Sequence, residues 1–301
     1  MPKVSIIVPF NNGKKYLKNC LNNLININYV DYEIIFIDDF SKDNSEEIAK
    51  KYKNTKFFYT TEETIGVGNA RNLGIEKARG KYIMFVDVDD SIDKNLLKNL
   101  EKYIDKNVEM IKYKMKIIGE KEVCADGPVF DLINGEDGFN KLCFEDKYLD
   151  SPCLYLIKKE LFERTNLKFE KNVYHEDFGL IPELLVNART IVSTNIYGYS
   201  YFQSENSIMR NADYSKRIKK VNDKFFLYDN LSRKIRDMKL EQNTQKNLLE
   251  YYTNSIILSI KDLNKKDKVK YKYKIRQKKM LDNLRVRNIK QWLKKSYIKY
   301  M

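Results

Sequence analysis

The first 86 residues alternate between short apolar runs typical of strands and stretches with helical spacing, and this alternation constrains the fold more than any other feature. The runs 4–8 and 33–37 are rich in Val, Ile and Phe, and leucines recur between them at helical intervals from Leu17 to Leu24. A further apolar run at 82–86 follows another predicted helix. Strands that alternate with helices predict an α/β fold with a mostly parallel sheet and helices on both faces.

The rest of the chain is less regular. Residues 95–104 have the apolar spacing of a helix, 110–118 alternate like a strand, and 119–138 are rich in turn-forming residues. Beyond Ser215 the pattern is helical, rich in lysine and nearly free of glycine. We therefore place a domain boundary after residue 215.

Composition describes a folded chain without a membrane-spanning segment. Of the 301 residues, 43% are hydrophobic and 13% aromatic, which excludes disorder of the whole chain. No apolar run approaches the roughly 18–20 residues that a spanning helix needs, and Met1-Pro2-Lys3 passes directly into a strand pattern without a signal peptide. These features predict a cytoplasmic protein. The four cysteines are scattered, so reduced thiols are expected rather than a zinc site or a disulfide framework.

The net charge of +14 is concentrated at the C-terminal end. Residues 216–301 contain 26 Lys and Arg against 8 Asp and Glu, whereas the residues before them contain 30 against 34. Near the end, Ile289, Trp292 and Tyr297 share one helical face that lysines border. A basic amphipathic helix of this kind suits an anionic membrane surface. A solvated helical appendage packed on the first domain and a nucleic-acid-binding surface are the alternatives.

Three carboxylates follow the last of the apolar runs within four residues, in the sequence Asp87-Val88-Asp89-Asp90. Their mutual repulsion costs stability unless a cation offsets it. Mg²⁺ and Mn²⁺ favour carboxylate oxygens and often bridge them to substrate phosphates, so a divalent metal is one interpretation of the cluster. The other is a solvated acidic turn that caps the following helix.

Two further loops carry polar groups at predicted strand ends. Asp39 ends the second apolar run, where it could accept a hydrogen bond from a base N–H or help to cap the next helix. Two glycines, Gly66 and Gly68, precede a helix that contains Arg71, whose guanidinium suits a phosphate or a nucleobase edge. The glycines by themselves are more typical of an ordinary turn.

The only histidine opens the sequence His175-Glu176-Asp177, ahead of an apolar helix. Acidic groups at a helix start usually interact with the helix dipole. A carboxylate beside a polar cleft would also suit a general base.

Taken together and in this order, these segments resemble the family 2 glycosyltransferases, which have the GT-A fold. The resemblance implies a Rossmann-like, mostly parallel sheet in a catalytic domain, residues 1–215, and a basic helical region, residues 216–301. Within the catalytic domain, 1–95 would be the nucleotide-binding half and 96–215 the acceptor-binding half. The segments that carry the resemblance, which covers about residues 1–210, are 4–11, 37–45, 66–75, 85–90 and 176–177.

The resemblance also implies roles for individual residues. Asp177 matches the catalytic base, and Asp89 together with Asp87 matches the pair that binds Mn²⁺ or Mg²⁺. Supporting positions are Glu176, Asp90 and His175. The residues expected to bind the nucleotide sugar are Pro9, Phe10, Asn11, Asp39, Gly68, Arg71, Asp87, Val88 and Asp89.

The activity that the resemblance implies is an inverting, metal-dependent transfer of a hexose or N-acetylhexosamine from a UDP-sugar. The acceptor would be a hydroxyl of a bacterial surface glycan, such as lipooligosaccharide or capsule, or of a lipid-linked oligosaccharide. Peripheral attachment to the inner face of the cytoplasmic membrane would bring the enzyme to such an acceptor, and no nucleic acid partner is expected. GDP- or dTDP-sugar donors are alternatives, as is a non-catalytic module that binds nucleotide or RNA. Cys153 and Tyr155 depart from the pattern, because relatives often carry Trp and Lys there.

Overall fold

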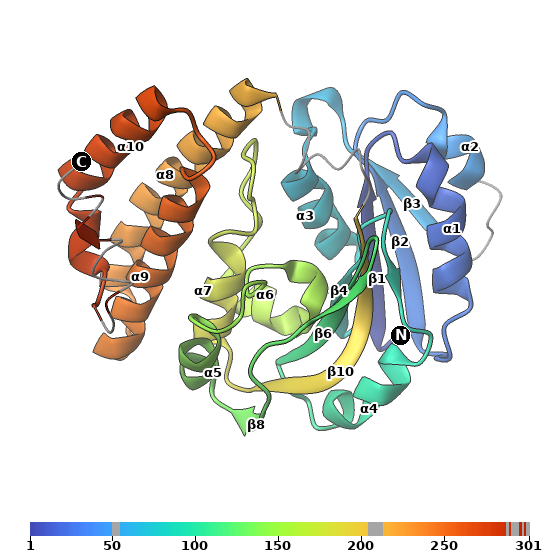
Figure 1. Cartoon of the computed structure of the whole chain (residues 1–301). Coiled ribbons are helices and arrows are strands. Elements are labelled where there is room, and N and C mark those ends of the chain that lie inside the picture. The colour runs from blue at the N-terminus through green and yellow to red at the C-terminus, as the bar shows by residue number, and fades with distance from the viewer. Residues whose placement is uncertain (50–54, 204–212, 287–288, 290–294, 297, 299–301) are drawn as a thin grey trace. The chain divides into compact units, whose positions relative to one another are not determined.

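The computed structural model describes residues 1–49, 55–203, 213–286, 289, 295–296 and 298 (Figure 1). It divides into two compact units, which comprise residues 1–207 and 208–301. The boundary expected from the sequence, after Ser215, falls in the first turn of helix α8 (Tyr214–Asp237).

In the first unit, the described residues form one ten-stranded sheet. Its main path follows the order β3-β2-β1-β4-β9-β6-β10-β5, with β7 beside β6 and β8 beside β10. The strands are β1 (Val4–Phe10), β2 (Tyr32–Asp38), β3 (Lys56–Tyr59), β4 (Tyr82–Phe85), β5 (Ser91–Ile92), β6 (Met110–Ile118), β7 (Glu122–Ala125), β8 (Phe130–Ile133), β9 (Tyr155–Lys158) and β10 (Ile191–Phe202).

The first four strands of this path form the parallel half of the sheet. β1 pairs in parallel with β2 and with β4, and β2 pairs in parallel with β3. All seven residues of β1 are buried, because helices cover this central strand on both faces. Figure 1 shows α1 (Lys14–Ile25) and α2 (Ser45–Ala49) on one side of these strands and α3 (Val67–Lys77) on the other. Right-handed crossovers require this arrangement, since the strand order runs one way from β1 to β3 and then reverses to β4. The predicted α/β fold is confirmed.

Beyond β4 the sheet is mixed. β9 runs antiparallel between β4 and β6, and β10 is parallel to β6. Residues 119–138, for which the sequence indicates a turn-rich stretch and no particular element, contain β7, β8 and the start of α5 (Gly135–Leu142). Both strands are four residues long and mostly exposed. They therefore lack the apolar alternation by which a strand is recognised in a sequence.

Three further helices belong to the first unit. The predicted helix at 95–104 is present, with its four apolar residues buried against the sheet. The other two flank the loop 166–179, which contains Glu176 and Asp177 and leads into α7. These helices are α4 (Leu96–Asp105), α6 (Lys159–Thr165) and α7 (Leu180–Asn187).

The second unit is helical and has its own core. Its long helices are α8, α9 (Gln242–Ser259) and α10 (Lys265–Gln277). The rings of Phe225 and Tyr271 stack with their centroids 5.8 Å apart, which packs α8 against α10. No helix within the described ranges is long and apolar enough to span a membrane. The predicted amphipathic face around Trp292 lies largely outside the described residues.

A buried carboxylate joins the amino ends of the parallel strands. Glu33 accepts hydrogen bonds from the Ser5 hydroxyl and the Arg79 N–H, both at 2.7 Å, and its other oxygen lies 2.7 Å from Lys56 Nζ. Burial alone would raise the pKa of Glu33, but these partners outweigh burial and lower the pKa to about 2.

We expect Glu33→Gln to destabilise the fold by about 2 kcal/mol at neutral pH, because a buried charge-assisted network loses its acceptor. The Glu33 contribution should be complete above the pKa of an unfolded glutamate, near 4.5, and should be lost as the pH falls toward about 2. Urea unfolding of both proteins between pH 7 and pH 3 measures the difference. If the difference in free energy of unfolding between the two proteins stayed constant across this pH range, the prediction would be contradicted.

Candidate active site

Asp39 lies just beyond the carboxyl end of β2 and joins three segments. The N–H of Gly66 donates to its Oδ1 at 2.8 Å, and the Thr60 hydroxyl donates to the same oxygen at 2.9 Å. Burial raises the pKa of Asp39 by more than these hydrogen bonds lower it. Gly66 has a φ of 128°, a backbone conformation that favours glycine. The carboxylate thus fixes the turn that begins α3 against the ends of β2 and β3.

The end of β1 lies beside Asp39. The Asp39 N–H donates to the Phe10 carbonyl at 2.7 Å, and the Asn11 side-chain amide donates to the Asp39 carbonyl at 2.6 Å. The Phe10 ring is buried and packs edge-on against Phe36, and the hydrogen bond to Asp39 is made by the Phe10 carbonyl. Pro9 lies in the strand itself, opposite Ile37. Three of the predicted nucleotide-binding positions therefore adjoin Asp39 directly or through β1.

Arg71 connects two distant acidic segments. Its Nη1 pairs with Glu176 Oε1, and its Nη2 lies 3.0 Å from Asp87 Oδ1. The guanidinium is 5% exposed and lies over the Phe169 ring, 5.4 Å from the ring centroid. Burial would lower the pKa of Arg71, but Glu176 and then Asp87 raise it above its usual value. Its Nε is buried and has no hydrogen-bond partner among the described residues.

The first turn of α3 meets the acidic loop closely at Gly68. A Cβ at this position would lie 2.3 Å from the Glu170 carbonyl oxygen and 3.2 Å from the Glu176 Cβ. Only a residue without a side chain allows this approach. Gly68 therefore acts by letting the loop before α7 reach Arg71.

The turn after β4 is held by a tyrosine from β10. The Asp87 N–H donates to the Tyr199 hydroxyl at 3.2 Å, and that hydroxyl donates to Asp90 Oδ2 at 2.7 Å. The N–H of Phe202 donates to the other Asp90 oxygen at 2.9 Å. Burial, and then the neighbouring Asp87, raise the pKa of Asp90 to about 8. Asp90 thus supports the turn from inside the protein, whereas Asp87, Val88 and Asp89 are partly exposed.

Asp87 and Asp89 are the candidate ligands for a divalent cation. Among the described residues, no group of three or more His, Cys, Asp and Glu side chains is arranged to hold a metal ion. Burial, followed by Asp87, raises the pKa of Asp89, which indicates negative charge without full compensation. Mg²⁺ is usually held by one or two carboxylates together with substrate phosphates. The two side chains therefore fit a cation that would complete its coordination with a bound diphosphate.

Asp177 lies in the loop before α7, next to Glu176. Burial and then Glu176 and Asp150 raise its pKa well above the usual value, while Arg71 opposes them. A carboxyl group with a raised pKa is a better proton acceptor than an ordinary aspartate. His175, in the same loop, adopts the left-handed conformation, with a φ of 61°, and its carbonyl accepts the Phe178 N–H at 3.1 Å.

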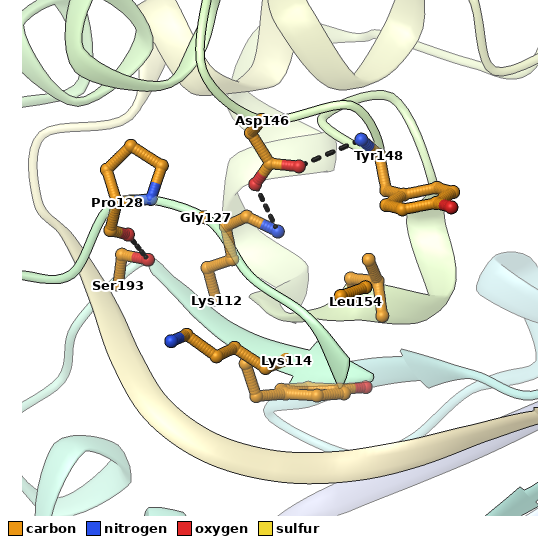
Figure 2. A pocket seen from close by; sticks show the side chains of 10 residues that line it. Lys112, Lys114, Gly127, Pro128, Asp146, Tyr148, Leu154 and Ser193 are labelled. Carbon is orange, nitrogen blue, oxygen red and sulfur yellow. Dashed lines mark hydrogen bonds and ion pairs between the residues drawn. The ribbon is translucent and has the colours of Figure 1, made fainter. Parts of the chain in front are cut away.

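A buried ion pair anchors the segment that carries Asp150 (Figure 2). Lys112 Nζ lies 2.9 Å from Asp146 Oδ2, and the Tyr148 N–H donates to the other Asp146 oxygen at 2.8 Å. The Lys112 ammonium also lies over the Tyr155 ring, 5.0 Å from its centroid. The adjoining cavity has a volume of about 10 Å³, room for about one water molecule. These contacts indicate a structural support rather than a ligand site.

The structure thus brings together most of the site predicted from the sequence. Arg71, Asp87 and Glu176 form one network, and Asp39 with Asn11 forms a second at the neighbouring strand ends. Tyr199, Phe169 and Thr60 contact these residues but are not predicted from the sequence as their partners. Tyr199 belongs to an alternating run of tyrosines at 197–201, which is a weak signal, whereas Phe169 and Thr60 have none. Cys153, one of the two departures, is buried, and its carbonyl accepts the Tyr113 hydroxyl at 2.8 Å.

A parallel half with acidic groups at its carboxyl edge, joined to a mixed half that supplies an acidic loop, defines the GT-A class of glycosyltransferases. Solved structures share this fold. The Staphylococcus aureus TarS 1-349 structure in complex with UDP-GlcNAc matches with a TM-score of 0.73 at 20% identity, over 94% of this chain and 82% of that one. The Pyrobaculum calidifontis mannosyltransferase PcManGT, in complex with GDP-Man and Mn²⁺, matches with a TM-score of 0.56 at 14% identity, over 99% of this chain and 85% of that one.

The model of the family "Glycosyl transferase family 2" matches residues 5–163, and the chain belongs to this family. Glycosyltransferase GlyG of Streptococcus pneumoniae is 28% identical over 69% of this chain and 73% of its own length. The poly(ribitol-phosphate) beta-N-acetylglucosaminyltransferase TarS of S. aureus is 27% identical over 66% of this chain. That match spans 36% of the length of TarS.

Proposed function

We propose that the first unit is the catalytic domain of an inverting transferase that moves a hexose or N-acetylhexosamine from a UDP-sugar to a hydroxyl of a bacterial surface glycan or lipid-linked oligosaccharide. The observation that carries the proposal is the Arg71 network. It places a buried cation between Asp87 on the turn after β4 and Glu176, which precedes Asp177. One cation therefore connects the proposed donor site to the proposed base.

The donor would bind at the carboxyl ends of β1, β2 and β4. Asp39, whose pKa burial raises, would face the nucleobase from the end of β2. Arg71, whose Nη2 lies 3.0 Å from Asp87 Oδ1, would add positive charge at this edge of the sheet. Support for uridine comes from TarS, a fold neighbour whose solved complexes contain UDP-GlcNAc and UDP.

The transfer would be a single in-line displacement. The acceptor oxygen attacks C1 of the sugar, the bond from C1 to the diphosphate oxygen breaks, and the acceptor proton passes to the Asp177 carboxylate. UDP leaves with the bonding electrons. A Mn²⁺ or Mg²⁺ ion held by Asp89 and Asp87 would neutralise the charge of the departing diphosphate. Tyr199 and Asp90 would keep the turn that carries these carboxylates in place.

The second unit would bring the enzyme to an anionic membrane surface. Val269 and Tyr273 are exposed on α10, and exposed lysines, including Lys266 and Lys270, lie on the same helix. Burial, and then Lys278 and Lys270, lower the pKa of Lys274, so positive charges crowd this helix. A basic helix with exposed apolar side chains suits an interface with anionic lipids.

The experiment that tests the proposal measures UDP release from UDP-GlcNAc, UDP-glucose and UDP-galactose, each with Mn²⁺, with Mg²⁺ and with EDTA. We expect one donor to be consumed only with metal. Asp89→Ala should lower this rate by about 10²-fold or more, since it removes a carboxylate from the proposed metal site. The exposed Asp31→Ala provides a matched control and should behave as wild type. Equal rates with metal and with EDTA would remove the metal from the proposal.

A further inference from the structure

A groove separate from the donor site lies between α3 and α6, both labelled in Figure 1. Its volume is about 510 Å³, within the range of small-molecule binding sites. None of the residues assigned above to donor, metal or base lines it. It is therefore a cavity of ligand size apart from the residues of the proposed donor site.

The groove combines an apolar floor with polar groups that have unused hydrogen-bonding capacity. Leu73 of α3 and Phe162 of α6 contribute apolar surface. Asn69 is buried and donates to the Ile65 carbonyl at 3.3 Å, but its Oδ1 has no partner in the part of the chain that the structure describes. Within the same part, the Asn166 side chain and the Lys168 ammonium make no hydrogen bond or ion pair.

The groove is lined by three lysines, Lys159, Lys168 and Lys171, and by two glutamates, Glu76 and Glu163, so its net charge is small. Lys159 lies 3.6 Å from Glu163 and donates to the Ala78 carbonyl at 2.9 Å, so this cation is already satisfied. Amide groups beside an apolar surface suit a sugar, because a pyranose presents hydroxyls at its edge and C–H groups on its face. A phosphate-bearing ligand is often held by the planar fork of an arginine, and none of the lining residues is an arginine.

The groove also touches the segments that hold the catalytic network. Asn72 of α3 makes two hydrogen bonds with the backbone of Phe169. Its side-chain amide donates to the Phe169 carbonyl at 2.9 Å, and its side-chain oxygen accepts from the Phe169 N–H at 3.0 Å. Lys168 and Lys171 of the same loop line the groove, and the loop continues to Glu176. A ligand in the groove would therefore contact both α3 and the loop that reaches Arg71.

We propose that this groove binds a short run of neutral sugar residues, as a second glycan contact apart from the hydroxyl that accepts the transferred sugar. The proposal rests on the proposed function, because it supposes that the acceptor is a glycan. It adds that the enzyme recognises acceptor residues remote from the reacting hydroxyl.

The test titrates the full-length, ¹⁵N-labelled protein with maltotetraose, cellotetraose, chitotetraose and β-1,4-galactotetraose while UDP and Mn²⁺ are saturating. At least one oligosaccharide should shift the backbone amide signals of Asn72, Leu73 and Leu167. Asn166→Gly combined with Lys168→Ala should weaken that binding about tenfold, since two hydrogen-bonding groups are lost. Glycine is chosen because Asn166 has a φ of 52°.

A matched control makes the same changes at the end of α4. Asn107 also has a positive φ, of 58°, and follows Lys106, so Asn107→Gly with Lys106→Ala removes the same two residue types away from the groove, together with the hydrogen bond that Asn107 accepts from Lys81. This double variant should bind the oligosaccharide as wild type does. The groove proposal is overturned if no oligosaccharide binds, if both double variants bind equally, or if the shifted signals belong to residues beside Asp177. Failure of UDP to bind would instead count against the proposed function, so the two results are distinguishable.

Discussion

Asp177→Asn should lower the rate of UDP release from the preferred UDP-sugar by about 10²–10⁴-fold, the range typical of losing a general base. The amide has nearly the same shape as the carboxylate but cannot accept the acceptor proton. UDP binding, measured by calorimetry, should be nearly unchanged, because the nucleotide is proposed to bind at the strand ends around Asp39. The variant should thus separate binding from turnover.

The pH dependence of this rate provides a second measurement. Burial and the neighbouring Glu176 and Asp150 raise the pKa of Asp177, while Arg71 opposes them. The base acts only when deprotonated, so activity should fall as the pH drops through this raised pKa, at a higher pH than for an ordinary aspartate. Glu170→Gln, an acid-to-amide change on the exposed part of the same loop, is the control and should keep the wild-type profile. A wild-type rate in Asp177→Asn would remove this residue from the mechanism.

Arg71→Met should destabilise the first unit by about 3–5 kcal/mol, because it leaves the buried Glu176 carboxylate without its partner. Urea unfolding measures this loss. The variant should also bind UDP much more weakly, since the guanidinium that adjoins Asp87 is absent.

The double variant Arg71→Met with Glu176→Gln separates the two effects. Removing the charge of Glu176 as well should recover much of the lost stability, since no unpaired buried charge remains. It should not recover UDP binding, because the guanidinium is still missing. If the double variant regained UDP binding, Arg71 would be only a structural partner of Glu176.

The parallel half of the fold could be predicted from the sequence because its signals are local. The apolar runs that became β1, β2 and β4 are buried and continuous, and helical spacing is clear in the segment that became α1. The same locality placed Asp39 and Asp87 at strand ends. Parallel strands bring such ends to one edge of the sheet, so neighbours in space can be inferred without knowing any side-chain contact.

The site contacts that could not be predicted from the sequence join residues far apart in the chain. The hydrogen bond between Tyr199 and Asp90 joins residues 109 positions apart in the sequence. The one between Asn72 and Phe169 joins residues 97 positions apart. No periodicity within a short window reports such pairs. The strands β7 and β8 were missed for a different reason, since exposed four-residue strands bury too little apolar surface to leave a pattern.

The hydrogen bonds of Tyr199 and Asp90 affect the order in which parts of the fold can form while the chain is being synthesised. The turn that carries Asp87 is synthesised early, yet its tyrosine support is supplied 112 residues later, by β10. Long-range contacts of this kind form late, because the loop that they close must first lose its conformational freedom. During synthesis, the parallel half can therefore pack before its nucleotide-binding edge is complete. Donor binding should accordingly become possible only once β10 has emerged and paired with β6.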